Sequence, residues 1–396
     1  MIQHENETEI TEICPADDCT GCFACKNICP KDAIETQTDM FGRTLPEIDP
    51  EKCIRCGACQ RVCPVQHPVT VEKPKQCFAA QRKSAEARNG SASGGIGAAL
   101  AECILAGGGV VYGAAVQPGG KVEHIRADSL VSAQRLKNSK YVQSDIGLSY
   151  RSVRKDLKDG KTVLFTGTPC QIAGLRNYLG KDEARLYCVD IVCHGVPPMR
   201  FLEAHFASVI PDTQIASYTF RGGSPDFRLT VSDGERTVYD KFRRLDPYYI
   251  TFFNGTSYRE NCYHCVYAKP SRCSDLTIGD FWGLDRSSLQ SEMQGNISVV
   301  LPNTPKGAEL LKMVSGDLIS EERELEEAVN GNDQLRAPSE KSAWRDLFIR
   351  SLANGEDIEK SMLAAGGQKD IDAYLASQTF AGKAKRKVKK ILSRFM

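Results

Sequence analysis

The feature that most constrains this chain is a pair of cysteine runs near its N-terminus. Each run reads Cys-x2-Cys-x2-Cys-x3-Cys-Pro, with cysteines at Cys19, Cys22, Cys25 and Cys29 and again at Cys53, Cys56, Cys59 and Cys63. Three thiolates in one tight loop can bind three irons of a cubane only if the backbone curls around it. Gly21 and Gly57 permit that curl, which also turns backbone N–H groups towards the sulfides. The two runs therefore predict two 4Fe-4S clusters.

The assignment of ligands follows from the way such runs are used in two-cluster bacterial ferredoxins, where the fourth cysteine crosses to the other cluster. We predict that cluster one is held by Cys19, Cys22, Cys25 and Cys63, and that cluster two is held by Cys53, Cys56, Cys59 and Cys29. The alternative is a pair of structural zinc sites. Zinc uses thiolates in two separated pairs, whereas each run offers three thiolates and a remote fourth.

Length and composition set the remaining limits. The 396 residues favour two or three domains, and the net charge of +1 identifies no partner. The 17 cysteines and an N-terminus without a secretory pattern favour reduced thiols in a cytoplasmic protein. The apolar stretch 96–116 contains Glu102 and three consecutive glycines, so we expect no membrane span there. No nucleic-acid-binding motif is present, and no such partner is expected.

The pattern changes after the cysteine runs, and we expect an α+β protein. Residues 1–72 form the ferredoxin domain, residues 73–337 a larger mixed domain, and residues 338–396 a helical extension. Within the larger domain we expect helices at 95–105, 150–158, 169–179 and 198–209, alternating with strands at 110–116, 122–126, 162–165 and 186–192. Strands at 215–220, 227–231 and 237–242 follow, separated by glycine-rich turns.

A second cysteine group lies in the later half of the chain. Cys262, Cys265 and Cys273 are close in sequence, and Cys193 follows a predicted strand, where α/β proteins place their chemistry. These four thiols predict a third 4Fe-4S cluster. A structural zinc knot and unligated reduced thiols remain as alternatives, because the gap before Cys273 departs from ferredoxin spacing.

Five segments carry a family resemblance. SASGGIGAAL, NSKYVQS, GTPCQIAGLR, CHGVPP and SDLTIGDFWG occur in this order after the cysteine runs. Together they resemble the coenzyme F-420 hydrogenase/dehydrogenase beta-subunit family, over roughly Cys19 to Leu284. The resemblance implies a noncovalent FAD that passes electron pairs between a two-electron donor and iron-sulfur clusters. One departure is Asn138, where the family commonly has glycine.

The residues themselves also suggest where a flavin would bind. An apolar strand ends in Thr-Gly-Thr and Pro169 then opens a helix, which places N–H groups at a positive dipole end suited to a pyrophosphate. A second helix start follows Ser93, while Lys140 offers a charge and Tyr141 a stacking surface. The predicted flavin residues are Ser93, Gly94, Gly95, Ser139, Lys140, Tyr141, Gly167, Thr168, Pro169, Cys170 and Gln171. Taken alone, each of these features is also consistent with a helix cap, a turn or, for Cys170, a small core residue.

We therefore expect a flavoprotein oxidoreductase with two or three 4Fe-4S clusters and FAD. Its electron partner would be F-420, ferredoxin or another redox subunit, and its substrate an unidentified small molecule or glycan-linked metabolite. A flavin is needed because a cubane carries one electron at a time whereas hydride chemistry moves two. The alternative is an electron-conduit subunit without a substrate of its own. No residue is assigned a catalytic role.

The C-terminal tail combines an apolar stripe with a basic face. Val388, Ile391, Leu392 and Phe395 recur at helical spacing among seven lysines and arginines. This pattern predicts peripheral contact with an anionic membrane, on its cytoplasmic face. A solvated, frayed terminus is the alternative.

Overall fold

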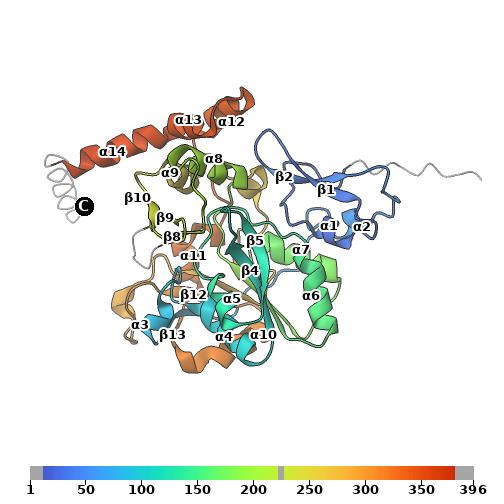
Figure 1. The fold of residues 1–396 in the computed structure, drawn as a ribbon. Coiled ribbons are helices and arrows are strands. Elements are labelled where there is room, and N and C mark those ends of the chain that lie inside the picture. The colour runs from blue at the N-terminus through green and yellow to red at the C-terminus, as the bar shows by residue number, and fades with distance from the viewer. Residues whose placement is uncertain (1–11, 222–226, 380–396) are drawn as a thin grey trace, which may run out of the picture.

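A computed structural model describes residues 12–221 and 227–379, and its fold is α+β, as predicted (Figure 1). A small cysteine-rich part comes first and contains a two-stranded antiparallel hairpin in which Ile34 lies opposite Ile48. Its elements are α1 (Ala24–Ile28), β1 (Ile34–Thr38), β2 (Thr44–Ile48) and α2 (Ala58–Arg61). These elements are short because the cysteine loops, rather than long periodic runs, make up most of this part.

The larger part is built on an eight-stranded sheet with the order β13-β3-β12-β11-β7-β6-β4-β5. Its strands are β3 (Cys77–Arg82), β4 (Val110–Val116), β5 (Val122–Ala127), β6 (Val163–Gly167), β7 (Leu186–Ile191), β11 (Leu276–Asp280), β12 (Ser298–Pro302) and β13 (Leu318–Arg323). Strands β4, β6, β7 and β11 are parallel. Strand β3 runs the same way, because β12 is antiparallel to both β11 and β3. The carboxyl ends of five strands therefore lie at one edge, the usual place for a ligand in such sheets.

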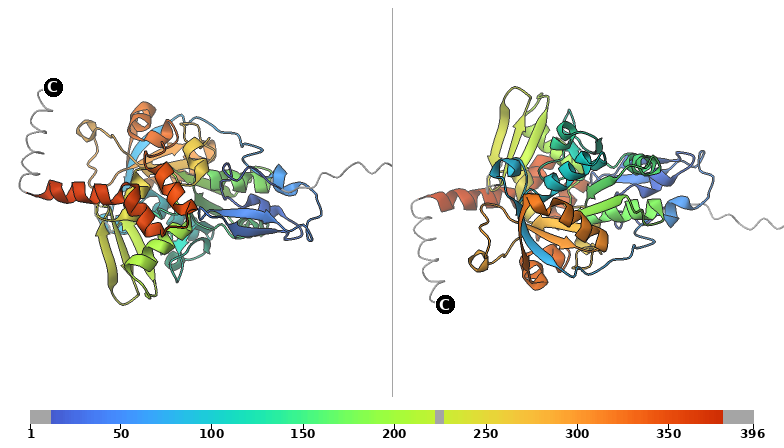
Figure 2. Two further views of the ribbon diagram at one scale, coloured as in Figure 1. Left: turned by 90° about the horizontal axis from the view of Figure 1, so that it is seen from above. Right: turned by 90° about the horizontal axis from the view of Figure 1, so that it is seen from below.

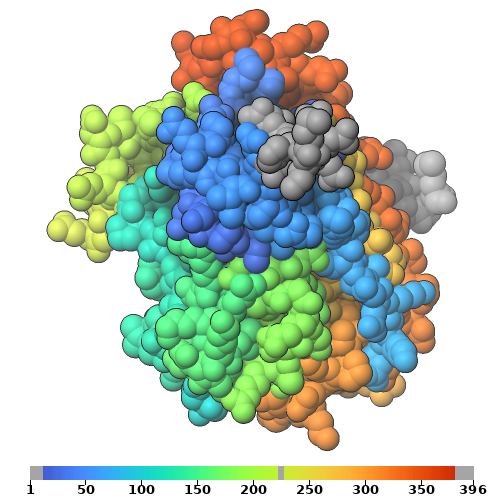
Figure 3. Space-filling model, turned by 90° about the vertical axis from the view of Figure 1, so that its right-hand side faces the viewer, coloured from blue at the N-terminus to red at the C-terminus, as the bar shows by residue number. Residues whose placement is uncertain are grey.

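Helices cover both faces of this sheet. Because neighbouring residues of a strand point to opposite faces, Leu164 packs with Leu100 and Leu310 on one side, while Phe165 packs with Tyr150 and Ile172 on the other. The first face carries α4 (Ile96–Ala106), α5 (Leu130–Gln134) and α10 (Pro305–Val314). The short α3 (Ala85–Arg88) follows β3 and buries none of its residues. The second carries α6 (Ser149–Lys158) and α7 (Pro169–Leu179). The cysteine-rich part rests on α6 and α7, as its blue surface above the green one shows (Figure 3).

A second layer of structure is built around a three-stranded antiparallel sheet. It contains β8 (Ser217–Arg221), β9 (Phe227–Ser232), β10 (Thr237–Phe242), α8 (Met199–Val209) and α9 (Pro247–Phe253). The C-terminal α12 (Arg345–Ala353) and α13 (Ile358–Met362) pack on it, and α14 (Gln368–Gln378) points away from the cysteine-rich part (Figure 2). The tail predicted to contact a membrane, 382–396, lies outside the described residues.

The remaining elements are short. They are α11 (Leu325–Gly331), the 3-10 helices η1 (Glu260–His264), η2 (Arg286–Ser288), η3 (Ser315–Asp317) and η4 (Asp333–Leu335), and the π-helical turn η5 (Leu363–Gly367). The stretch 96–116 forms α4 and β4, which the glycines at 107–109 separate. Within the described ranges, no helix is both long and apolar enough to cross a bilayer.

Candidate iron-sulfur and flavin site

The two cysteine runs share one backbone shape. Gly21 and Arg55 occupy equivalent positions in the two runs and have left-handed φ angles of 64° and 55°. Two residues later, Phe23 and Gly57 are also equivalent and also left-handed, with φ angles of 52° and 68°. Each run thus needs two left-handed residues, of which only one is glycine. A bulky residue such as Phe23 is strained in this conformation, and such strain clusters at functional sites. The expected curl around a cluster is therefore present in both runs.

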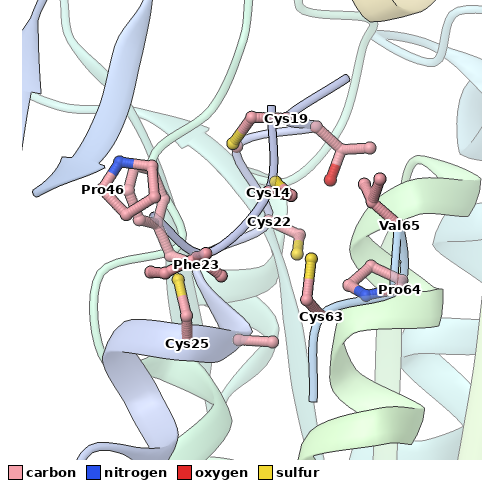
Figure 4. Close-up of a pocket in the computed structure, with 13 residues that line it drawn as sticks. Cys14, Cys19, Cys22, Phe23, Cys25, Pro46, Cys63, Pro64 and Val65 are labelled. Carbon is pink, nitrogen blue, oxygen red and sulfur yellow. The ribbon is translucent and has the colours of Figure 1, made fainter. Parts of the chain in front are cut away.

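Cysteines from both runs meet at one cavity. Cys19, Cys22, Cys25 and Cys63, the predicted ligands of cluster one, all line it, and Figure 4 shows them around a common space. Backbone N–H groups near these sulfurs lower the pKa of the thiols, for example Gly21 at Cys19, Ala24 at Cys22 and Val65 at Cys63. Four buried thiols surrounded by N–H donors fit a 4Fe-4S cluster, whose potential depends on such hydrogen bonds. The individual ligands stay predictions.

Cys14, which we did not predict as part of the site, lines the same cavity. Its thiol is close enough to Cys19 and Cys63 for its proton to be shared with them, which lowers the pKa of Cys19 to about 6 and that of Cys63 to about 7. The same interaction raises the pKa of Cys14. Cys14 is thus a potential hydrogen-bond donor beside two predicted ligands. Because it lies outside the repeated spacing, only its short distance in sequence from Cys19 could have suggested it.

The second predicted site lies at the more exposed end of the cysteine-rich part. Cys29 and Cys59 pack beside Cys25 and Cys63 in one apolar cluster. Burial raises the pKa of Cys59, and the neighbouring thiols of Cys53 and Cys56 act in the same direction. Cys56 is exposed, whereas the cysteines of the first site are buried. Cys53, Cys56 and Cys59 are thus neighbours, and Cys29 belongs to the same cluster as Cys59. The crossed ligation of this second site stays a prediction.

The second cysteine group gathers at the carboxyl edge of the large sheet. Cys193 follows β7, and Cys262 belongs to η1. Burial raises the pKa of Cys193, and the charges of Cys262, Cys170 and Cys265 add to this effect, so these four thiols are neighbours. Cys273 donates to the carbonyl oxygen of Pro169 at 3.3 Å. In the described ranges, no three His, Cys, Asp or Glu side chains have the spacing of a single-ion site, and ligation here stays a prediction.

The start of α7 faces these thiols. The Thr168 N–H donates to Gln171 Oε1 at 3.0 Å, and the N–H groups of Gln171 and Ile172 both donate to the Thr168 carbonyl oxygen. Pro169 has no N–H, which leaves Cys170 as the first residue of the helix with an N–H directed outwards. The positive end of a helix dipole favours thiolates and anions. At the start of α7, the groups that this positive end would stabilise as anions are the thiols of the second cysteine group beside Cys170.

The other predicted flavin residues lie in two segments, one that follows β3 and one in the loop after α5. Gly95 begins α4 with a left-handed φ of 83°, and Gly94 donates to Ser298 Oγ at 3.0 Å. Lys140 Nζ donates to backbone carbonyls of its own loop, including Lys137 at 2.6 Å, and burial lowers its pKa to about 7. The Tyr141 ring packs 4.6 Å from the ring of Phe252. Tyr141 is thus part of an aromatic wall, and Lys140 stiffens the loop that carries it.

Arg221, which we did not predict as part of the site, joins these segments. It donates to both carboxylate oxygens of Asp280, at 2.9 and 2.6 Å, and to the carbonyl oxygen of Ala92, next to Ser93. Its backbone carbonyl accepts from the Asn138 side chain. Asn138 has a left-handed φ of 72°, which explains why glycine is common there and why asparagine is tolerated. A lone arginine in a strand gave no signal for this role.

The two helix starts are too far apart to hold one phosphate group together. Strands β12, β11 and β7 lie between β3, which precedes α4, and β6, which precedes α7. At a strand spacing of about 4.8 Å, the two ends are roughly 19 Å apart. A dinucleotide lying along the edge could reach from one to the other, whereas a single pyrophosphate could not.

Helix α7 also touches the first cluster site. A methyl group at Gly174 would lie 2.8 Å from Cys22 Sγ. Alanine normally stabilises a helix interior by about 1 kcal/mol relative to glycine. Here we expect the reverse, because Gly174→Ala would push Cys22 out of position and lower the content of cluster one, measured as iron per chain and by electron paramagnetic resonance (EPR). Gly97→Ala in α4 is the matched control, since its methyl group would meet Ile278 at an ordinary 3.4 Å. Equal iron in both variants would contradict this expectation.

The paired cysteine runs, the cavity that they share and the sheet edge beside it define an iron-sulfur electron-transfer protein. Residues 18–67 match the family model described as 4Fe-4S dicluster domain. Residues 160–328 match the family model for the C terminus of the beta subunit of coenzyme F420 hydrogenase/dehydrogenase. The chain therefore carries a 4Fe-4S dicluster domain followed by a C-terminal domain of the coenzyme F-420 hydrogenase/dehydrogenase beta-subunit family, as the resemblance predicted. It is an electron-transfer oxidoreductase subunit with iron-sulfur clusters.

Solved structures and curated proteins give two further findings. A chain of the xenon-derivatised F420-reducing [NiFe] hydrogenase complex from Methanosarcina barkeri is 18% identical, with a TM-score of 0.47, over 74% of this chain and 92% of that chain. No curated protein matches the sequence.

Proposed function

We propose that the chain is an FAD-dependent iron-sulfur oxidoreductase in which α7 links the ferredoxin clusters to the flavin site. The observation that supports this proposal is that two cysteines from different parts of the chain lie on or against the same helix, α7. Cys22 packs against Gly174 in the middle of α7, while Cys170 stands at its start among the second cysteine group. Four residues of helix rise about 6 Å. Cluster one and the sheet edge are therefore about one helical turn apart.

Different residues along the carboxyl edge would bind different parts of the cofactor. We propose that FAD lies along the carboxyl edge, with Ser93, Gly94 and Gly95 at one end, Ser139 to Tyr141 beside it, and Gly167 to Gln171 at the other. The flavin supplies the exchange of electron pairs, whereas each cluster supplies single electrons. Arg221 and Asp280 hold the segment before Ser93 against the end of β11. The aromatic wall around Tyr141 keeps water from this part of the edge.

A third cluster is proposed at the second cysteine group, where Cys193, Cys262 and Cys265 are neighbours. Cys273 is the fourth ligand that the sequence predicts, and Cys170 is a further thiol whose charge acts on Cys193 and Cys262. A zinc knot and unligated thiols remain the alternatives for these residues. The electron partner is proposed to be F-420, ferredoxin or a redox subunit, and the substrate a small or glycan-linked molecule. The proposed location is cytoplasmic, with the C-terminal tail on an anionic membrane.

Cofactor analysis of the full chain tests the proposal. Protein purified without oxygen should release FAD on denaturation and contain about eight irons for two cubanes, or about twelve with a third. Cys265→Ser should then lose about four irons while the spectrum of the ferredoxin clusters persists. A preparation that holds its iron but neither contains nor takes up FAD would overturn the flavin assignment. A wild type limited to about eight irons after reconstitution would remove the third cluster.

The electron-conduit alternative is favoured by one feature of the structure. Lys140 Nζ and the Thr168 N–H, two of the groups predicted to bind the flavin, are bonded within their own segments. A conduit subunit would pass electrons from cluster to cluster without a flavin. Clusters that are reduced by dithionite and reoxidised by ferredoxin in flavin-free protein would support this alternative.

A further inference from the structure

Arg259 is one of the largest fully buried side chains in the described residues, with 1% of its surface exposed. It lies at the start of η1, three positions before Cys262, and its backbone carbonyl accepts from the Cys262 N–H at 3.0 Å. Its side chain leaves this segment and enters the cysteine-rich part. One residue therefore connects the second cysteine group with the first cluster site.

The guanidinium is held by neutral oxygens. Nη2 donates to the carbonyl oxygen of Cys19 at 2.9 Å, and Nη1 donates to Gln143 Oε1 at 2.8 Å and to the Thr44 carbonyl at 3.3 Å. Nε is buried and has no hydrogen-bond partner among the described atoms. No carboxylate of the described residues lies within 4.0 Å of this guanidinium.

A buried cation without an anionic partner is costly. The other arginines at this boundary avoid that cost. Arg43 pairs with Asp17 and Asp39, and Arg151, which donates to the Cys29 carbonyl, pairs with Asp32. Arg259 differs in that it has no such ion pair among the described residues, and its charge acts instead on the thiols of Cys19, Cys170 and Cys262. Its charge lowers the pKa of Cys19, after the larger effect of the Cys14 hydrogen bond.

We propose that Arg259 is the buried counter-cation of cluster one and raises the reduction potential of that cluster. The proposal rests on the assignment of Cys19 as a ligand of cluster one. A cubane with four thiolates is anionic and gains one more negative charge when it takes up an electron. A fixed positive charge next to the first ligand therefore favours the reduced form, in line with the dependence of cluster potential on charge. Arg259 is a positioning residue, since it acts through Cys19 rather than on a substrate.

The same charge reaches the second cysteine group. It acts to lower the pKa of Cys262 and of Cys170, which stabilises their thiolates, although burial has the larger effect and raises the pKa of both. Gln143 fixes the position of the cation from the other side, because its side chain also lies against Gly21, and a methyl group there would meet Gln143 Nε2 at 2.2 Å. Arg259 thus stands between the two thiol groups that the proposed electron path joins.

An EPR-monitored redox titration of the full chain tests this role. Arg259→Gln should move the midpoint potential of one cluster at least about 59 mV to the negative side. For a one-electron couple, this shift is a tenfold fall in the ratio of reduced to oxidised cluster at a fixed potential. Arg259→Lys keeps the charge and should stay near the wild type. Arg151→Gln is the matched control, because its charge is balanced by Asp32 and partly exposed, and it should leave cluster one unshifted.

A further variant covers the case in which Arg259→Gln does not retain its clusters. Gln143→Glu places a carboxylate beside the guanidinium without changing the arginine, and it should shift the same cluster in the same direction. Unchanged midpoints in Arg259→Gln, or in Gln143→Glu where the former loses iron, would overturn the proposal while leaving the clusters themselves established. A wild type without EPR-active clusters would instead refute the ligand assignment on which the proposal rests.

Discussion

Cys63→Ser is expected to remove cluster one and to leave cluster two in place. The expected loss is about four of eight ferredoxin irons. The reason is that Cys63, although it is the last cysteine of the second run, lines the same cavity as Cys19, Cys22 and Cys25 of the first run. Iron analysis and EPR of the reduced protein measure the effect, since the magnetic coupling between two reduced clusters should disappear with one of them.

Two further cysteine variants sharpen this test. Cys14→Ser changes a thiol that lines the same cavity but is not a predicted ligand, so it should retain all its iron. Cys29→Ser should damage cluster two, because crossed ligation assigns this thiol to the second run. If Cys63→Ser lost the cluster of its own run instead, or if Cys14→Ser lost as much iron as Cys63→Ser, the ligand assignment would be wrong.

Eight of the elements between residues 95 and 209 were predictable because local patterns decide them, whereas the short α5 was not predicted. Pro169 at the first position of α7 and the apolar run of β6 fix their boundaries, and each of the eight predicted elements there lies within two residues of the observed one. The order of the sheet was not predictable. Strand β3 pairs with β12 and β13, more than 200 residues later in the chain, and no local feature of these strands encodes that pairing.

Some residues of the candidate site were also predictable from local patterns, and others were not. The cysteine spacing predicted which thiols meet, since Cys63 joins the first run in space. Arg259 and Arg221 could not be predicted, because each acts through partners that only the tertiary fold brings near, and for Cys14 the sole signal was its short distance in sequence from Cys19. Lys140 shows the opposite case, in which a residue type suggested a ligand contact that the structure does not favour. Its residue type suited a phosphate, yet its amine is bonded to the carbonyls of its own loop.

A buried ion network attaches the C-terminal helices to the rest of the fold. His205 of α8 is fully buried between Asp246 and Glu359, with Nε2 3.1 Å from Asp246 Oδ2 and Nδ1 2.8 Å from Glu359 Oε2. Tyr239 also donates to Asp246. Burial lowers the pKa of His205, but the two carboxylates outweigh this effect and raise it to about 10. The histidine is therefore charged in the folded protein at neutral pH.

His205→Leu should destabilise the protein by about 3–5 kcal/mol, because it leaves two buried carboxylates without their cation. That corresponds to a fall in the thermal midpoint on the order of 5–10 °C at neutral pH. The folded protein binds this proton more tightly than the unfolded chain, whose histidine pKa is about 6.5. The stabilisation is therefore complete below pH about 6.5 and is lost as the pH rises towards about 10.

The difference in thermal midpoint between wild type and His205→Leu should accordingly shrink across that pH window. His124 provides the control, because it is a buried histidine whose pKa burial lowers to about 4. It is neutral in the folded protein, so the effect of His124→Gln should be constant above pH about 6.5 and should change only on acidification. A His205→Leu difference that does not change between pH 6.5 and 10 would show that this histidine is not held as a cation, and that the C-terminal helices are attached by apolar packing alone.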